Sequence, residues 1–196
     1  MKKKVIKMLL GNVIIGLGIS VGVFANLGID PGMTFYYGMS NVSGMSLGLS
    51  TALFNIIFLL PLFFFDRQRI GIATIINMMF MGYIVEFFNI YIFHEVLLEY
   101  SIWNVLILFF GIILQSLGVA LYSSTQLGQS PLDGIPNVLI KVTGKGNYRV
   151  YRVVQDMVLV TIGFLCGANV GIGTLLLMML TGPFIHFFQE KLKENR

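Results

Sequence analysis

The chain has 196 residues, of which 56% are hydrophobic and 11% charged, and its mean hydropathy is +0.84. A soluble domain carries about 25% charged residues, so this composition excludes a soluble domain and indicates an integral membrane protein. The net charge of +4 does not indicate nucleic-acid binding, because the basic residues stand in short clusters between apolar runs. The single cysteine, Cys166, excludes an intrachain disulfide.

The first half of the chain is expected to hold three membrane-spanning helices and one short helix. The expected spans are 8–27, 47–65 and 70–93, each close to the ~20 residues that cross a bilayer. The short segment 31–43 begins at a proline and cannot cross. Although the basic start and apolar run look like a cleavable leader, the run has a counterpart at 108–127 inside the chain, so we predict a retained helix.

The second half is expected to repeat this plan after an acidic loop at 94–100. Its expected spans are 102–121, 150–166 and 171–188, its short segment is 131–142, and a charged tail begins at residue 189. All 13 lysines and arginines then lie on or near one side of the membrane, so the positive-inside rule places both termini in the cytoplasm. If the short segments also crossed, basic stretches would lie outside, so we predict six spans.

The two halves match at a shift of 100 residues, and the informative matches are glycines and prolines, because these residues mark backbone geometry. They are Gly11/Gly111, Gly18/Gly118, Gly28/Gly128, Pro31/Pro131, Gly44/Gly144, Gly71/Gly171 and Gly82/Gly182. We therefore predict two transmembrane repeats, 1–98 and 99–196. Because each holds an odd number of spans, the second is inverted, which is a known transporter plan.

Both repeats break at a Leu-Gly-x-x-Pro motif, at 27–31 and 127–131. In each motif the glycine is expected to end a helix in the left-handed conformation, and the proline to begin the next helix. Asp30 and Ser130 are the expected N-caps, and Asp133 completes a capping box with Ser130. The two short helices are expected either to direct their N-termini into a shared polar cavity or to lie flat at the interfaces.

The predicted fold is therefore an all-α polytopic membrane protein. It has six transmembrane helices arranged as two inverted three-helix repeats, each with a short proline-started half-helix.

These motifs resemble those of the YczE/YyaS/YitT group of small bacterial integral membrane proteins, and within it the YczE branch. The resemblance covers nearly the whole chain and rests on Leu27-Gly28-x-x-Pro31, Gly71-x-x-Thr74 with Gly82, Gly128-x-x-Pro131-x-Asp133-Gly134, Arg152 with Asp156, and Gly171-Ile172-Gly173-Thr174 with Gly182-Pro183. It implies a multi-pass protein of the cell membrane and carries over no settled biochemical activity.

Polar residues within apolar segments are the candidates for a substrate site, because a charge at the centre of a span costs about 2.5–3.5 kcal/mol. Arg152 and Asp156 lie one turn apart and are expected to pair, either in a site or as an anchor near the headgroups. Glu86 and His186 are candidates for proton coupling or for interfacial anchoring. The candidate substrate-binding residues are Asn26, Asp30, Asn55, Asn77, Gln126, Ser130, Asp133, Arg152 and Asp156, with Gln115 as a further polar position.

No catalytic triad, phosphate loop or metal-ligand cluster stands out, so we predict no enzyme activity, no metal and no cofactor. The expected function is a secondary transporter or exporter of a small polar solute, with the lipid bilayer as its surroundings. The alternative is a non-transporting membrane subunit that captures a substrate or assists another complex. Gly18-x-x-x-Gly22 suits close packing against a second copy or a partner helix and supports that alternative.

Overall fold

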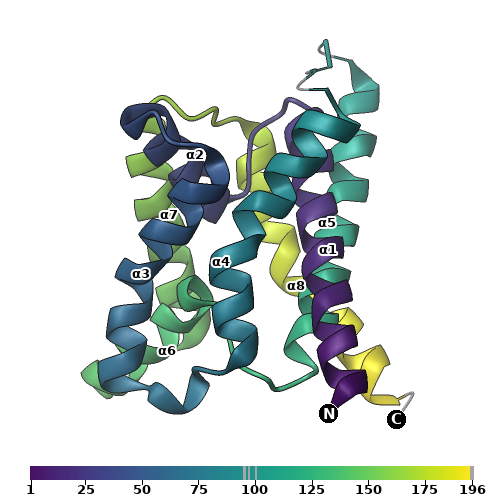
Figure 1. Cartoon of the computed structure of the whole chain (residues 1–196). Helices are drawn as coiled ribbons and strands as arrows, with labels where there is room; N and C mark the ends of the chain where they lie inside the picture. The colour runs from purple at the N-terminus through teal and green to yellow at the C-terminus, as the bar shows by residue number, and fades with distance from the viewer. Residues whose placement is uncertain (95, 97, 100, 195–196) are drawn as a thin grey trace. The chain divides into compact units, whose positions relative to one another are not determined.

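The computed structural model describes residues 1–94, 96, 98–99 and 101–194, and within these residues all regular secondary structure is helical (Figure 1). The helices are α1 (Lys2–Phe24), α2 (Pro31–Ser43), α3 (Leu47–Phe65), α4 (Ile72–Phe87), α5 (Ile102–Ser123), α6 (Pro131–Thr143), α7 (Tyr148–Leu165) and α8 (Ile172–Glu194). A 3-10 turn, Arg67–Arg69, precedes α4, and a π-helical turn, Phe88–Ile92, follows it.

Five helices of the described part of the chain are long and apolar enough to cross a membrane: α1, α3, α4 with its π-helical turn, α5 and α8. Helix α7 is not one of them, since it carries Arg149, Arg152 and Asp156. The chain is thus a polytopic helical membrane protein, and a sixth span through α7 stays a prediction. The charged tail that begins at residue 189 is helical as far as Glu194, because α8 extends to that residue.

The helices group into two compact units, and each unit takes segments from both halves of the sequence. Unit 1 comprises Met1–Asp30, Tyr83–Gln126 and Asn169–Arg196, and therefore holds α1, the end of α4, α5 and α8. Unit 2 comprises Pro31–Gly82 and Leu127–Ala168, and holds α2, α3, the start of α4, α6 and α7. The division into 1–98 and 99–196 follows the sequence repeat instead and stays a prediction.

Unit 1 is built on the close packing of α1 against α5. A Cβ atom added at Gly18 would lie 2.4 Å from the backbone nitrogen of Gln115, so only glycine allows this approach. Gly22 faces the same helix, where an added Cβ would lie 3.9 Å from Leu108. The prediction that Gly18 and Gly22 form a face for a partner helix is therefore wrong, because both lie against α5 of the same chain.

In unit 2 each short helix lies beside a long helix from the other half of the sequence, α2 along α7 and α6 along α3 (Figure 1). A Cβ added at Gly38 would lie 2.7 Å from the carbonyl oxygen of Gly163. A Cβ added at Gly134 would lie 2.4 Å from the Leu62 side chain. In both short helices the first turn is mostly buried and the last residues are exposed. Burial therefore changes along the length of each helix rather than only around it.

The segment between α1 and α2 that carries the Leu-Gly-x-x-Pro motif, called a break here, forms hydrogen bonds with the start of α8 within unit 1. The carbonyl oxygen of Leu27 accepts a hydrogen bond from the Gly173 N–H at 2.7 Å. The Ile29 N–H donates to Thr174 Oγ1 at 3.1 Å. Gly28, at φ 122°, sits so close that an added Cβ would lie 2.6 Å from the same hydroxyl oxygen.

The break between α5 and α6 makes the corresponding contacts with the start of α4 within unit 2. The carbonyl oxygen of Leu127 accepts from the Ala73 N–H at 3.0 Å. Gly128, at φ 130°, leaves 2.6 Å between an added Cβ and Thr74 Oγ1. The Gly-x-x-Thr sequences that begin α4 and α8 are therefore docking points for the breaks.

Two local predictions about these breaks are wrong. The first left-handed residues after α1 and α5 are Asn26 and Gln126, at φ 54° and 56°, and the glycines, at φ 122° and 130°, stand two positions further from the helix ends. Ser130 stands at the N-cap of α6 without a side-chain hydrogen bond, and the Asp133 carboxylate pairs with Arg152 instead of completing a capping box. The charge of the partner accounts for this choice, because the Arg152 guanidinium carries a full positive charge, whereas a helix N-terminus carries only about half of one.

Candidate functional site

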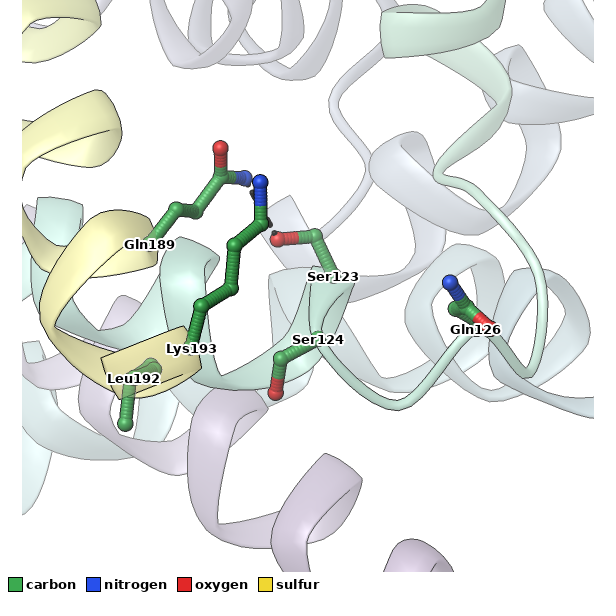
Figure 2. Close-up of a pocket in the computed structure, with 6 residues that line it drawn as sticks. All are labelled: Ser123, Ser124, Gln126, Gln189, Leu192 and Lys193. Atoms are coloured by element: carbon green, nitrogen blue, oxygen red, sulfur yellow. Dashed lines mark hydrogen bonds between the residues drawn. The ribbon is translucent and has the colours of Figure 1, made fainter. Parts of the chain in front are cut away.

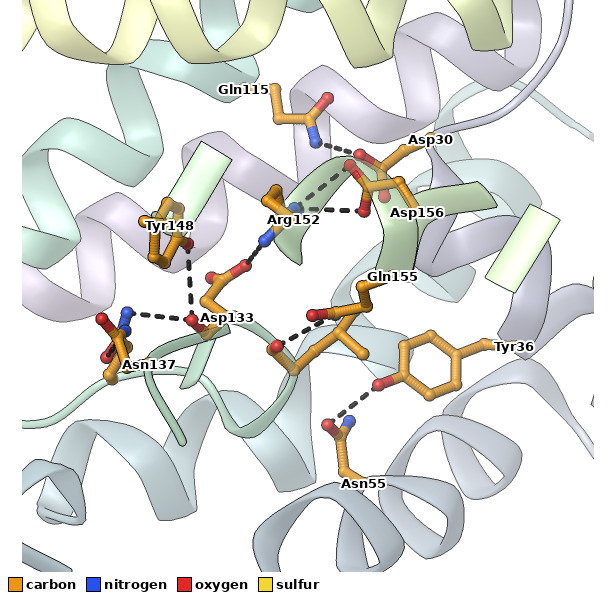
Figure 3. Close-up of polar contacts among 12 residues, drawn as sticks. Asp30, Tyr36, Asn55, Gln115, Asp133, Asn137, Tyr148, Arg152, Gln155 and Asp156 are labelled. Carbon is orange, nitrogen blue, oxygen red and sulfur yellow. Dashed lines mark hydrogen bonds and ion pairs between the residues drawn. The ribbon is translucent and has the colours of Figure 1, made fainter. Parts of the chain in front are cut away.

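A cluster of charged side chains joins α6 to α7 within unit 2 (Figure 3). Asn147 caps α7 by accepting a hydrogen bond from the Val150 N–H at 3.0 Å. The helical period then places Arg152 and Asp156 on one face, one turn apart. Pro131 begins α6 and sets Asp133 in its first turn. Local sequence thus fixes which residues each helix presents.

Arg152 is the centre of this cluster, because its guanidinium contacts both carboxylates. Its Nη1 donates to Asp133 Oδ1, and its Nε lies 3.1 Å from Asp156 Oδ1 and 3.2 Å from Asp156 Oδ2. The Asp156 side chain is only 7% exposed, whereas those of Arg152 and Asp133 keep 28% and 33%. One guanidinium and two carboxylates give these three side chains a formal charge of −1.

Three neutral side chains hold the first turn of α6 beside the cluster. Gln155 Nε2 donates to the carbonyl oxygen of Leu132 at 3.0 Å. The carbonyl oxygen of Asp133 accepts from Gln129 Nε2 at 3.2 Å and from the Tyr148 hydroxyl at 3.4 Å. These contacts fix the backbone that carries the Asp133 carboxylate, so Gln129, Tyr148 and Gln155 are positioning residues for the cluster.

The structure brings together three of the predicted site residues, Asp133, Arg152 and Asp156. Sequence reasoning missed Gln155, although it lies three residues after Arg152 and so shares its helix face. Tyr148 carried no comparable signal, because it reaches Asp133 only through the packing of α6 against α7. Gln129 was also missed, although it lies only four residues before Asp133, in the segment that leads into α6.

The other predicted residues of unit 2 lie outside these contacts. Asn55 is buried, and its Oδ1 accepts from the Tyr36 hydroxyl at 2.9 Å while its Nδ2 donates to the Thr51 carbonyl oxygen at 2.9 Å. The amide oxygen therefore ties α2 to α3, and the amide nitrogen bonds within α3. Asn77 is buried on α4, and Ser130 makes no capping hydrogen bond at the start of α6.

The remaining predicted residues belong to unit 1. Asn26 ties the end of α1 to a loop, because its Nδ2 donates to the Leu98 carbonyl oxygen at 3.2 Å. Asp30 Oδ2 accepts from Gln115 Nε2 at 2.9 Å. Glu86 is half-buried on α4, whereas His186 is exposed on α8 with its Nδ1 3.7 Å from Glu190 Oε1. Titration coupled to a solute by Glu86 or His186 stays a prediction.

Gln126 lines a surface pocket of unit 1 at the C-terminal ends of α5 and α8 (Figure 2). The other lining residues are Ser123, Ser124, Gln189, Leu192 and Lys193. Gln189 Nε2 donates to Ser123 Oγ at 2.9 Å, which ties the two helix ends together. Lys193 suits this place, since a cation is favourable near the partial negative charge of helix C-termini.

A second ion cluster fixes the far end of α6. Asp66, directly after α3, accepts from Arg69 Nε at 2.6 Å and from Lys141 Nζ at 3.2 Å. Burial of Asp66 alone would raise the pKa of its carboxyl, but the hydrogen bonds from Arg69 and Lys141 outweigh that effect and lower the pKa below 3.8.

Among the described residues, no group of three or more His, Cys, Asp or Glu side chains is placed to hold a metal ion.

Comparisons with known proteins agree with the helical membrane fold. The chain is 26% identical over 178 residues to the uncharacterized membrane protein YczE of Bacillus subtilis (strain 168). The aligned region covers 90% of this chain and 81% of that protein. The chain is 24% identical over 179 residues to the uncharacterized protein YyaS of the same organism, covering 91% and 89%. No solved structure matches the chain.

The predicted resemblance to the YczE and YyaS proteins is confirmed by these relatives. A family model described as a family of unknown function, DUF6198, matches residues 2–190. The chain therefore belongs to the DUF6198 family and is similar to membrane proteins of the YczE type.

Proposed function

We propose that this protein is a secondary transporter or exporter of a small polar solute, and that the ion cluster of unit 2 is its binding site. The observation that carries the proposal is the contact of Arg152, on α7, with Asp156 of the same helix and with Asp133, which lies in the first turn of the short, proline-started helix α6. Charged groups are expensive inside a membrane and are kept where they bind, relay or couple. A helix that starts inside the protein also offers free N–H groups to a ligand.

The proposal includes the inverted arrangement of the two repeats. It is supported by the corresponding contacts of the two breaks, in which Gly28 lies against Thr174 and Gly128 against Thr74. Gly28 corresponds to Gly128 and Thr74 to Thr174, each at the shift of 100 residues that relates the two repeats. Transporters built from inverted repeats bind their substrate where such broken helices meet.

Burial along the short helices also supports entry into the protein rather than a flat position at the interface. A flat amphipathic helix is buried along one face over its whole length. In α2 the residues from Pro31 to Tyr36 are buried and those from Asn41 to Ser43 are exposed. The same gradient runs from Pro131 to Thr143 in α6.

Transport is tested with the purified full chain in proteoliposomes, using radiolabelled amines, amino acids and small anions. We expect uptake of one solute class, its loss in Asp133→Asn, and its retention in the matched control Lys145→Gln, because Lys145 is exposed and outside the cluster. Equal uptake in all three proteins would remove the cluster from the site. A solute that binds to the protein but is never moved would favour the non-transporting subunit.

The orientation is tested by cysteine accessibility after Cys166 has been replaced. We expect Gln68→Cys, in the basic turn after α3, to be labelled only from the cytoplasmic side, because the positive-inside rule places this turn there. Labelling of that position from outside intact cells would contradict the inverted arrangement.

A further inference from the structure

The Gln155 side chain carries a buried hydrogen-bond acceptor that nothing in the described part of the chain satisfies. Gln155 is 9% exposed, and its Oε1 has no hydrogen-bond partner. Its Nε2 must face Leu132, because a carbonyl oxygen only accepts, so the amide oxygen is directed the other way. A buried acceptor without a donor is unfavourable, and a ligand that supplies an N–H or O–H group removes that cost.

The same position in the first repeat shows what a satisfied amide looks like. Asn55, 100 residues earlier, has its amide oxygen bonded by the Tyr36 hydroxyl at 2.9 Å. The residue that corresponds to Tyr36 is Pro136, whose side chain has no donor. At this pair of positions the amide oxygen is therefore satisfied in the first repeat and open in the second.

The charge of the cluster indicates which kind of donor would bind. Arg152 is shared between Asp133 and Asp156, so these three side chains together carry a formal charge of −1. The N-terminus of α6 offsets this by about half a positive charge. Lys141, at the other end of α6, is paired with Asp66. The electrostatic balance at the first turn of α6 therefore favours a cation over an anion.

We propose that this site binds a small organic cation with N–H donors, an ammonium or guanidinium group. The carboxylates of Asp133 and Asp156 match its charge, and Gln155 Oε1 accepts a hydrogen bond from one of its N–H groups. Figure 3 shows these three side chains. The inference deepens the proposed function, since it assigns a solute class to the same site. It excludes small anions as the preferred ligands, although a helix N-terminus alone would favour them.

Binding is tested by thermal unfolding of the purified full chain with methylammonium, tetramethylammonium, urea and acetate at matched ionic strength. A ligand that binds the folded state raises the unfolding temperature, and at equal concentration a tighter ligand raises it more, by an amount that grows with the logarithm of the affinity. We expect methylammonium to stabilise most, since tetramethylammonium has the charge without N–H groups and urea has N–H groups without the charge. Stronger stabilisation by acetate, or none by methylammonium, would overturn the inference.

The role of Gln155 is tested by Gln155→Met, with Gln189→Met as the matched control. Both substitutions remove one side-chain amide hydrogen bond, but Gln189 lies in unit 1, bonded to Ser123. We expect Gln155→Met to weaken methylammonium binding about tenfold to a hundredfold, the value of a hydrogen bond to a charged donor, and Gln189→Met to leave it unchanged. An equal effect of the two substitutions contradicts the assignment.

Failure of this inference can be told apart from failure of transport. If methylammonium binds in a Gln155-dependent manner but no solute crosses the proteoliposome membrane, the result supports the cation-binding site and contradicts the transporter proposal. If acetate is taken up and methylammonium does not compete with its uptake, the result supports transport and contradicts the cation-binding site.

Discussion

The replacement Gly128→Ala tests whether the break between α5 and α6 depends on its docking to α4. Gly128 has φ 130°, which L-residues rarely adopt, and this strain costs about 1–3 kcal/mol. The added Cβ would also lie 2.6 Å from Thr74 Oγ1 and 2.8 Å from the Gly71 nitrogen. Overpacking of this kind costs about 1–3 kcal/mol more. We therefore expect the free energy of unfolding to fall by about 2–6 kcal/mol.

The controls are glycines whose surroundings are open. An added Cβ at Gly144 or Gly182 meets nothing within 4 Å. Gly144→Ala is strained only by its φ of 64° and should cost about 1–2 kcal/mol. Gly182→Ala, inside α8, should stabilise by about 0.5–1 kcal/mol. Unfolding in detergent with rising SDS, followed by circular dichroism, measures all three. A Gly128→Ala variant no less stable than Gly144→Ala would refute the docking role.

Two further predictions concern side chains of unit 2. Tyr36→Phe leaves the buried Asn55 Oδ1 without its donor and should cost about 1–3 kcal/mol in the same unfolding assay, whereas Tyr91→Phe, at an exposed position, should cost nothing measurable. The pKa of Asp66 is lowered, so its pairing stabilises the fold fully above the unfolded value of 3.8 and is lost as the pH falls through the lower folded value. Unfolding measured across that range should show this loss in the wild type and not in Asp66→Asn; identical pH profiles would contradict it.

The sequence predicted the helices well because apolar length and breaker residues are local signals. The segments 31–43 and 47–65 coincide with α2 and α3, since proline begins one and a run of apolar residues fills the other. It also predicted the pairing of Arg152 with Asp156, because a separation of four residues on a helix brings side chains together. The family resemblance followed from the same glycine and proline spacing.

Other features were outside the reach of local reasoning. Asp133 was expected to cap α6, but Arg152, 19 residues later, offers a charged partner that only the packing of α6 on α7 brings near. The spacing of Gly18 and Gly22 suits a second copy or a partner helix as well as a helix of the same chain, because small residues indicate close packing without indicating which helix is packed; the structure places both glycines against α5.

Sequence alone determined the membrane class, the helix order and the two equivalent breaks, because hydropathy, helix length and backbone-breaking residues act over a few neighbouring positions. Tertiary structure decided which segments meet: the break after α1 binds the start of α8, and the break after α5 binds the start of α4. It also decided that Asn55 is satisfied while the Gln155 oxygen is left open. These outcomes depend on contacts between residues far apart in the chain, and hydrogen-bond satisfaction is set by the geometry of those contacts rather than by composition.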